Sequence, residues 1–282
     1  MKWQGRRGSR NIEDRRRSGG GARVGGIGVF GVLAILAIGY FTGIDVAPLL
    51  DQSATVQTAE PRELTAEDKA QGDFVSVVLA DTEHVWTKVF RDQLGAQYSP
   101  PVLVLFSQST ASPCGGASGA TGPFYCPVDS KVYLDTDFFA TLSRRLGAGG
   151  DFAAAYVVAH EVAHHVQNEL GVLEQTNAAK RQMSETDANQ VSVMTELQAD
   201  CLAGIWARYA EAELGTLERG DLSEAVNAAK QIGDDTLQRN AGQRPMPHTF
   251  THGTSAQRQR WFEQGYQTAN LERCDTFSAD SL

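Results

Sequence analysis

Positive charge is scarce in this 282-residue sequence once its first 23 residues are set aside. Those residues hold eight of the 25 Lys and Arg but only two of the 34 Asp and Glu, a net charge of +6. The remainder has 17 basic and 32 acidic residues, a net charge of −15. A body with this charge has no general attraction for nucleic acid, so we expect no nucleic-acid partner.

The sequence also lacks an internal repeat, and its 28 glycines, although somewhat numerous, are far from the content of a collagen-like chain. Hydrophobic residues make up 41% of the chain, which is ordinary for a globular protein and argues against wholesale disorder. A chain of this length can bury one sizeable core. The simplest expectation is therefore one folded domain with an appendage.

Cysteine is also scarce, with only Cys114, Cys126, Cys201 and Cys274. Four cysteines allow three pairings, and the sequence alone does not choose among them. Proximity favours a disulfide between Cys114 and Cys126, which flank a glycine-rich loop, and this leaves Cys201 with Cys274. Four unrelated reduced thiols are the alternative, which would be favoured if the body were cytosolic.

One long uncharged run, VGGIGVFGVLAILAIGYFTGI, covers residues 24–44. It is about long enough for a helix to cross the hydrocarbon core of a bilayer, so we predict a transmembrane helix. A buried core helix and a cleaved signal peptide are the alternatives. By the positive-inside rule the basic arm of residues 1–23 would stay cytoplasmic. The expected protein is a single-pass membrane protein whose body is extracytoplasmic, on the periplasmic or cell-surface side.

Residues 45–71 are polar, contain prolines and small residues, and are typical of a linker, so the predicted domain spans residues 72–282. Two short apolar runs favour strands: VLVLF at 102–106 and KVYLD at 131–135. Apolar spacing and helix boundary signals predict helices over about 73–94, 137–145, 151–170, 187–214, 221–232 and from about 255 onward. The predicted fold class is α+β, mainly helical with a small β-sheet.

The segment from His160 to His164 reads HEVAH and matches the metal-binding pattern HExxH inside the helix predicted over 151–170. Two histidines four residues apart lie on one helical face, so both imidazoles can reach one metal ion. The carboxylate of Glu161 can then reach the open coordination position of the ion. A bare HExxH also arises by chance, and a helix with surface His and Glu is the alternative.

A catalytic zinc ion needs a third protein ligand and an open position, and ELQAD on the second long helix offers one. If this helix packs across the first, Glu196 can reach the metal while Asp200 reaches the far nitrogen of a ligating histidine. Such a carboxylate fixes the tautomer of the ligand and strengthens it. An ordinary salt bridge is the alternative role of Asp200. Because no cysteine lies near HEVAH, a closed structural zinc site is disfavoured.

HEVAHH followed by ELQADCLAG resembles the zincins with a glutamate as third ligand, such as thermolysin and the membrane CAAX-protease relatives. With the N-terminal anchor, CGG…GPFYCP, IGDD and FTHGTSAQR, the chain is similar to the "putative neutral zinc metallopeptidase" family of bacteria, roughly from Phe74 to the end. The resemblance implies a zincin-like fold, one zinc ion on His160, His164 and Glu196, and base catalysis by Glu161.

The predicted chemistry follows from this arrangement. Zinc lowers the pKa of its bound water to about 7, Glu161 takes the proton, and the hydroxide attacks a polarised peptide carbonyl. Glu161 then protonates the leaving amine. KVYLD is expected to be the edge strand along which an extended peptide aligns by main-chain hydrogen bonds. His252 could donate to the developing oxyanion from a loop, or it could cap or pack the last helix.

We therefore predict a zinc-dependent endopeptidase whose partners are peptide or unfolded-protein substrates and, through its N-terminal helix, a membrane. The alternative is a non-catalytic, membrane-tethered module that binds metal or protein on the same fold. Glu161 favours the enzyme, because a module that only binds needs no base at that position.

Overall fold

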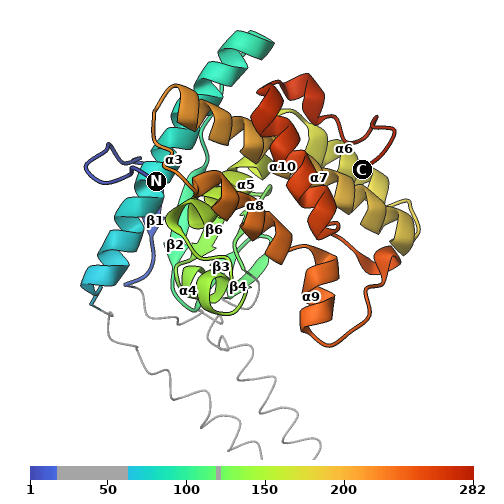
Figure 1. Cartoon of the computed structure of the whole chain (residues 1–282), viewed down its shortest axis with the longest axis horizontal. Helices are drawn as coiled ribbons and strands as arrows, with labels where there is room; N and C mark the ends of the chain where they lie inside the picture. The colour runs from blue at the N-terminus through green and yellow to red at the C-terminus, as the bar shows by residue number, and fades with distance from the viewer. Residues whose placement is uncertain (18–62, 119–121) are drawn as a thin grey trace, which may run out of the picture.

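The computed structural model describes residues 1–17, 63–118 and 122–282 of the chain, and helices make up most of this part (Figure 1). The helices are α3 (Ala66–Val89), α4 (Asp137–Arg144), α5 (Asp151–Glu169), α6 (Val172–Lys180), α7 (Glu185–Ala212), α8 (Asp221–Gln231), α9 (Asp234–Asn240) and α10 (Ser255–Thr268). Shorter helical turns cover Phe90–Leu94, Pro247–Thr249 and Leu271–Cys274. The strands are β1 (Ile12–Asp14), β2 (Val102–Phe106), β3 (Ser109–Ser112), β4 (Gly115–Ser118), β5 (Phe124–Cys126) and β6 (Lys131–Asp135).

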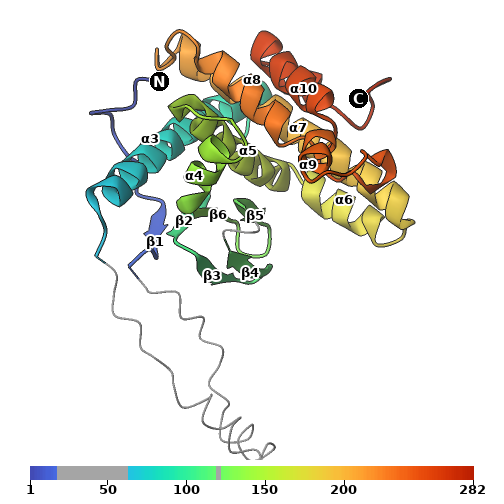
Figure 2. The same cartoon turned by 60° about the horizontal axis from the view of Figure 1, so that its bottom comes forward.

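The main sheet has the strand order β1-β2-β6-β5. The first three strands are parallel, with Leu103 opposite Val132, and β5 is antiparallel to β6. One face of the sheet packs into the helical core, and the other buries a small cluster that includes Val104 and Tyr133. Figure 2 shows the helices on one side of this sheet and the β3–β4 hairpin on the other. Strands β2 and β6 coincide with the two strands that the apolar runs predict.

Residues 1–17 are part of the same folded body as the rest of the described chain. Strand β1 pairs with β2, and the backbone N–H of Ser9 donates to the carbonyl of Ser76. The Met1 ammonium lies 2.5 Å from an Asp151 carboxylate oxygen, at the start of α5. Two arginines of this segment pair with acidic residues of the body, Arg6 with Asp81 and Arg7 with Glu83. The N-terminal segment therefore lies on the same side of any membrane as the body.

This packing shows that the predicted membrane topology is wrong. A single-pass protein with a cytoplasmic arm would separate residues 1–23 from the body by a bilayer, yet residues 1–17 contribute a strand to the main sheet. The helix predicted over residues 24–44 lies outside the described residues. Within the described ranges, no helix combines the length and the apolar character needed to span a membrane. The fold class with an N-terminal transmembrane helix, the single-pass localisation and the membrane partner are corrected accordingly.

Helix α3 starts earlier than its apolar pattern predicts. Its N-cap is Thr65, whose side chain accepts from the backbone N–H of Asp68 while the Asp68 carboxylate accepts from the N–H of Thr65. This reciprocal pair satisfies two backbone donors and fixes the start of the helix at Ala66, inside the stretch expected to be a linker. Helices α6 and α9 were not expected either, because their sequences are too polar to show a helical apolar stripe.

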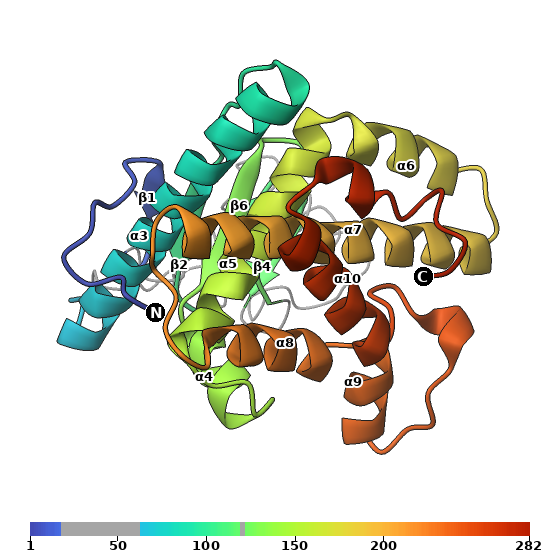
Figure 3. The ribbon, with the colours of Figure 1, turned by 45° about the horizontal axis from the view of Figure 1, so that its top comes forward.

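The core of the molecule is built around α5, which is buried almost along its whole length. Alanine and valine fill most of its buried positions, so neighbouring helices can approach it closely. Helix α7 packs across it, and α8 and α10 cover the outer side of this pair (Figure 3). The arrangement places the HEVAH segment at the centre of the fold.

Helices α7 and α10 touch through glycine. A Cβ atom built on Gly265 of α10 would lie 1.8 Å from the carbonyl oxygen of Cys201 on α7, and one on Gly204 would lie 2.0 Å from the carbonyl oxygen of Phe262. Only residues without a side chain permit this approach. A disulfide between Cys201 and Cys274, with Cα atoms 5.5 Å apart, joins α7 to the C-terminal segment beside the same contact.

We expect Gly265→Ala to lower the free energy of unfolding by about 2 kcal/mol, because the new methyl group forces two packed helices apart. Urea unfolding of the two proteins, followed by circular dichroism, measures this difference. Gly116→Ala is the matched control, since a Cβ at Gly116 would meet no atom within 4 Å. Equal stability of the Gly265 variant and the wild type would show that the α7–α10 contact is looser than described.

Candidate metal centre

Three side chains from two helices converge at the middle of the fold. His160 and His164 lie one turn apart on α5, and Glu196 comes from α7. Their potential ligand atoms all lie within 4.8 Å of one another. His160 Nε2 is 3.1 Å from one oxygen of Glu196, and His164 Nε2 is 3.4 Å from the other. Ligand atoms of a tetrahedral zinc ion stand roughly 3.3–3.6 Å apart, so these two separations are close to those around such an ion.

Each histidine is oriented by a partner on its other ring nitrogen. His160 Nδ1 lies 2.9 Å from Asp200 Oδ1, and His164 Nδ1 lies 2.8 Å from the amide oxygen of Gln167. Both partners accept, so each histidine carries its proton on Nδ1 and leaves Nε2 for a metal. Asp200 therefore lies where the sequence predicts it. Gln167 was not predicted, although it is the last residue of the HEVAHHVQ segment.

Gln167 is itself fixed from α7. Its amide nitrogen donates to the carbonyl of Thr195 and to the side-chain oxygen of Gln198. Because Thr195 precedes Glu196, the same stretch of α7 positions one predicted ligand and the partner of another. The side chain of Gln167 is completely buried, so these bonds are protected from water.

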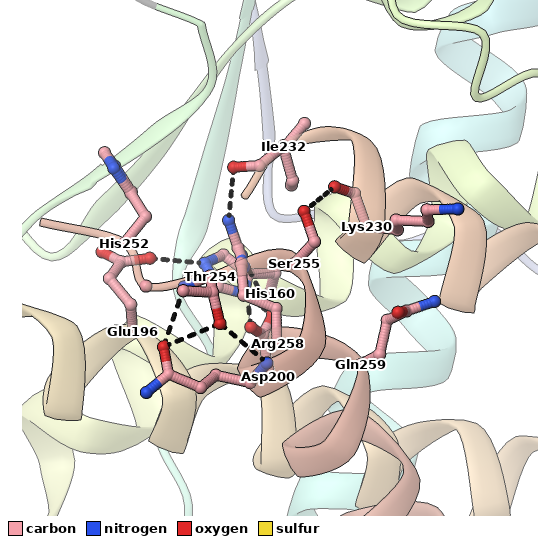
Figure 4. Close-up of polar contacts among 12 residues, drawn as sticks. His160, Glu196, Asp200, Lys230, Ile232, His252, Thr254, Ser255, Arg258 and Gln259 are labelled. Carbon is pink, nitrogen blue, oxygen red and sulfur yellow. Dashed lines mark hydrogen bonds and ion pairs between the residues drawn. The ribbon is translucent and has the colours of Figure 1, made fainter. Parts of the chain in front are cut away.

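Asp200 is held by a buried arginine from α10 (Figure 4). Arg258 Nε and one terminal nitrogen donate to the two oxygens of Asp200, at 2.8 and 3.0 Å. Arg258 is only 2% exposed and also donates to the Ile232 carbonyl and the Tyr156 hydroxyl. Burial favours a neutral Asp200, but the charges of Arg258 and His160 outweigh it and lower the pKa of Asp200 to about 2. The carboxylate stays ionised at neutral pH.

Glu161 lies on α5 beside the three converging residues and lines the same cavity. It is 8% exposed, and burial raises the pKa of its carboxyl group above the ordinary value, although the two histidines act in the opposite direction. A carboxyl group with a raised pKa is a better proton acceptor at neutral pH than an ordinary glutamate.

His252 enters the site from the loop before α10. Its Nδ1 lies 3.2 Å from Asp234 Oδ1, while Asp234 Oδ2 accepts from the backbone N–H groups of Thr251, His252 and Gly253. The hydrogen bond that His252 donates to Asp234 raises the pKa of His252, against the effect of burial. The side chain is half exposed and lines the cavity. The cap of α10 is Thr254 rather than His252.

His165 points away from this site. Its Nε2 lies 2.6 Å from the carbonyl of Ser99, and its Nδ1 lies 3.0 Å from the hydroxyl of Tyr125. The side chain thereby ties α5 to β5, which explains why this strand runs past the metal centre. Cys126, the last residue of β5, forms a disulfide with Cys114, with Cα atoms 5.8 Å apart. This disulfide and the one between Cys201 and Cys274 are the two pairs that proximity in the sequence favours.

A cavity of about 510 Å³ opens over the three residues. Its walls include Pro123, Phe124 and Tyr125 from the β5 segment and Leu173, Asn177 and Lys180 from α6. The expectation that KVYLD forms the edge strand is wrong, because β6 is paired on both sides, with β2 and β5. The edge strand beside the cavity is β5.

Comparison with known proteins places the chain in a family and identifies relatives. The model of a family described as "Putative neutral zinc metallopeptidase" matches residues 1–277. The uncharacterized protein YpfJ of Escherichia coli strain K12 is 41% identical over 286 residues, which cover 98% of this chain and 99% of that protein. An uncharacterized protein of Mycobacterium tuberculosis strain H37Rv is 48% identical over 195 residues, 66% of this chain and 65% of that one. No solved structure matches the chain.

We expect Asp200→Asn to weaken zinc binding by about 10- to 100-fold, because His160 loses the carboxylate that fixes its tautomer and strengthens it as a ligand. Competition with a chromophoric chelator measures the affinity, and circular dichroism checks that the variant is folded. Glu185→Gln, an exposed change in the first turn of the same helix, is the control. Unchanged zinc affinity in the Asp200 variant would remove this role from the residue.

Proposed function

The chain belongs to the putative neutral zinc metallopeptidase family, and we propose that it is a zinc-dependent endopeptidase with one zinc ion per chain. The observation that carries the proposal is the convergence of His160, His164 and Glu196 beside the buried Glu161, at the floor of a cavity. Two imidazoles and one carboxylate are a donor set typical of catalytic zinc, which keeps a position open for water or substrate. When bound there, zinc would supply a Lewis acid that polarises a carbonyl group and acidifies water.

Glu161 is the general base of this proposal. Its carboxylate takes the proton of the attacking water and afterwards passes it to the nitrogen of the leaving amine. Burial supports both steps, because it raises the pKa of Glu161 and brings it closer to neutral pH. The same residue can therefore accept and donate within one catalytic cycle.

His252 is proposed to stabilise the oxyanion that develops on the scissile carbonyl. Asp234 supports this role in two ways: it fixes the loop through three backbone N–H groups, and it favours the protonated imidazole. A protonated imidazole is a stronger donor to a developing negative charge than a neutral one.

Strand β5 is proposed to align the substrate. Within the part of the chain that the structure describes, β5 is paired on one edge, with β6, so its other edge can take main-chain hydrogen bonds from an extended peptide. The disulfide at Cys126 and the hydrogen bond from Tyr125 to His165 fix this strand relative to α5. An open cavity beside an edge strand suits binding in the middle of a peptide chain, as an endopeptidase requires.

Glu161→Gln separates this enzyme from a module that only binds metal. The amide keeps the shape of the side chain but cannot take a proton, so we expect zinc content to stay at the wild-type level while peptide cleavage falls about 10²-fold or more. His160→Ala and Glu196→Ala should lose both zinc and cleavage. Metal analysis and hydrolysis of an unfolded protein at near-neutral pH measure the two properties.

Glu169→Gln is the control, since this glutamate lies on the same helix but is exposed. If zinc-loaded wild type and the Glu161 variant cleave equally well, Glu161 is not the base. If zinc-loaded wild type cleaves no peptide or unfolded protein, the proposal of an endopeptidase fails.

The pair of Asp234 and His252 predicts a particular pH dependence. The hydrogen bond that His252 donates to Asp234 raises the pKa of His252, so the protonated form persists to higher pH than in an ordinary histidine. Asp234→Asn removes the negative charge and lowers that pKa, and we expect the alkaline limb of the kcat profile to move to lower pH. Asp235→Asn is the control, because Asp235 binds Ser255 and not His252. An alkaline limb that does not move would exclude His252 as the donor.

A further inference from the structure

One face of α6 lines the cavity with residues of three different kinds. Leu173, Asn177 and Lys180 are four and three residues apart, so they share a face of the helix, and all three border the cavity. Figure 3 shows α6 beside α7, the helix that carries Glu196. This face therefore presents an apolar, an amide and a cationic group in succession to whatever occupies the cavity.

The ammonium group of Lys180 is only weakly bound within the protein. Its hydrogen bond to Ser192 Oγ is 3.3 Å long and joins it to a neutral group. Among the residues that the structure describes, no carboxylate forms an ion pair with it, and the side chain is partly exposed. Arg258, the other permanently charged cation of this lining among the described residues, is by contrast buried and committed to Asp200. Lys180 is thus a permanent cation that borders this cavity and is available to a ligand.

The position of Lys180 relative to the metal centre follows from α7. Its partner Ser192 lies four residues before Glu196, so the two side chains share a helical face about 6 Å apart along the axis. An extended peptide advances about 3.3 Å per residue. If the scissile peptide bond lies next to Glu196, the ammonium group of Lys180 is therefore about two residues of extended peptide away from that bond.

We propose that Lys180, with the side-chain amide of Asn177, forms a subsite that binds a carboxylate of the substrate about two residues from the scissile bond. The inference rests on the proposed peptidase function and gives it a substrate class: peptides with Asp, Glu or a free C-terminal carboxylate at this distance. Leu173 offers apolar contact to the substrate in the same cavity. A lone ammonium in a partly exposed wall attracts a carboxylate most strongly at low ionic strength.

The test uses the zinc-loaded full chain and pairs of internally quenched peptides with amidated C-termini. Each pair differs only by Glu or Gln at one position from three residues before to three residues after the cleaved bond. We expect kcat/KM to be about 10-fold higher for Glu at the position that reaches Lys180, with a smaller ratio at high salt. A second set, with free and amidated C-termini at the same distance, distinguishes a terminal carboxylate from a side chain.

Variants of Lys180 test whether this residue causes the preference for Glu over Gln. Lys180→Met should bring the Glu-to-Gln ratio to about 1, Lys180→Arg should retain most of it, and Lys180→Glu should invert it in favour of basic peptides. Lys230→Met is the control, because Lys230 is exposed and lies outside this cavity, and it should keep the wild-type ratio. A wild-type ratio near 1 at every position, or a ratio that survives in Lys180→Met, overturns the subsite.

A binding measurement keeps this inference separate from the peptidase proposal. The same peptides are bound to the zinc-loaded Glu161→Gln chain and followed by fluorescence anisotropy. If no peptide is cleaved by the wild type but Glu peptides still bind about 10-fold more tightly than Gln peptides, and Lys180→Met removes the difference, the subsite stands and the proposed catalysis fails. Equal binding of both peptides would overturn the subsite.

Discussion

The buried ion pair of Asp200 and Arg258 is the interaction on which the rest of the structure depends. Two charges placed in the core are tolerable only when every polar atom finds a partner, and removing one partner of such a pair commonly costs about 3–5 kcal/mol. Here the carboxylate comes from α7 and the guanidinium from α10, while His160 and the Tyr156 hydroxyl of α5 bind the same carboxylate. One ion pair therefore fixes the relative positions of three helices, and the orientation of one predicted metal ligand is set by the same bonds.

This pair also explains the packing around it. A bidentate contact from α10 to α7 requires their backbones to approach closely, and Gly204 and Gly265 provide the space. Helix α10 can hold this position only if its start is fixed, which Thr254 achieves through its capping hydrogen bonds with Gln257. His252 lies two residues before that cap. Its placement over the cavity is thus linked through α10 to the orientation of His160, so the two sides of the site cannot shift independently.

The sequence predicts the candidate metal centre better than the architecture around it. Two pairs of residues spaced by four, His160 with His164 and Glu196 with Asp200, are local signals that a helix converts directly into geometry. Partners across the fold have no such signal: Arg258 lies 58 positions from Asp200, and nothing in its neighbourhood distinguishes a buried arginine from an exposed one. The N-terminal arm was misassigned for the same reason. Its arginines follow the pattern of a cytoplasmic flank, whereas the acidic partners of Arg6 and Arg7, Asp81 and Glu83, lie far along the chain.

The distribution of charge connects the metal centre with the cavity above it. Glu161, Glu196 and Asp200 bring three carboxylates close together, and Arg258 is the one permanent cation bound among them. Although burial acts in the opposite direction, the excess of negative charge raises the pKa of both His160 and His164 and favours a cation at this place, either protons on the imidazoles or a divalent metal ion that displaces them. His252 and Asp234 form a pair of opposite charge when the imidazole is protonated, so they add no net charge. Among the described residues that line the cavity, Lys180 then remains as a charge without an opposite partner, and it is positive. A body with a strong overall negative charge would otherwise repel acidic peptides, and this ammonium group offers them a local point of attraction.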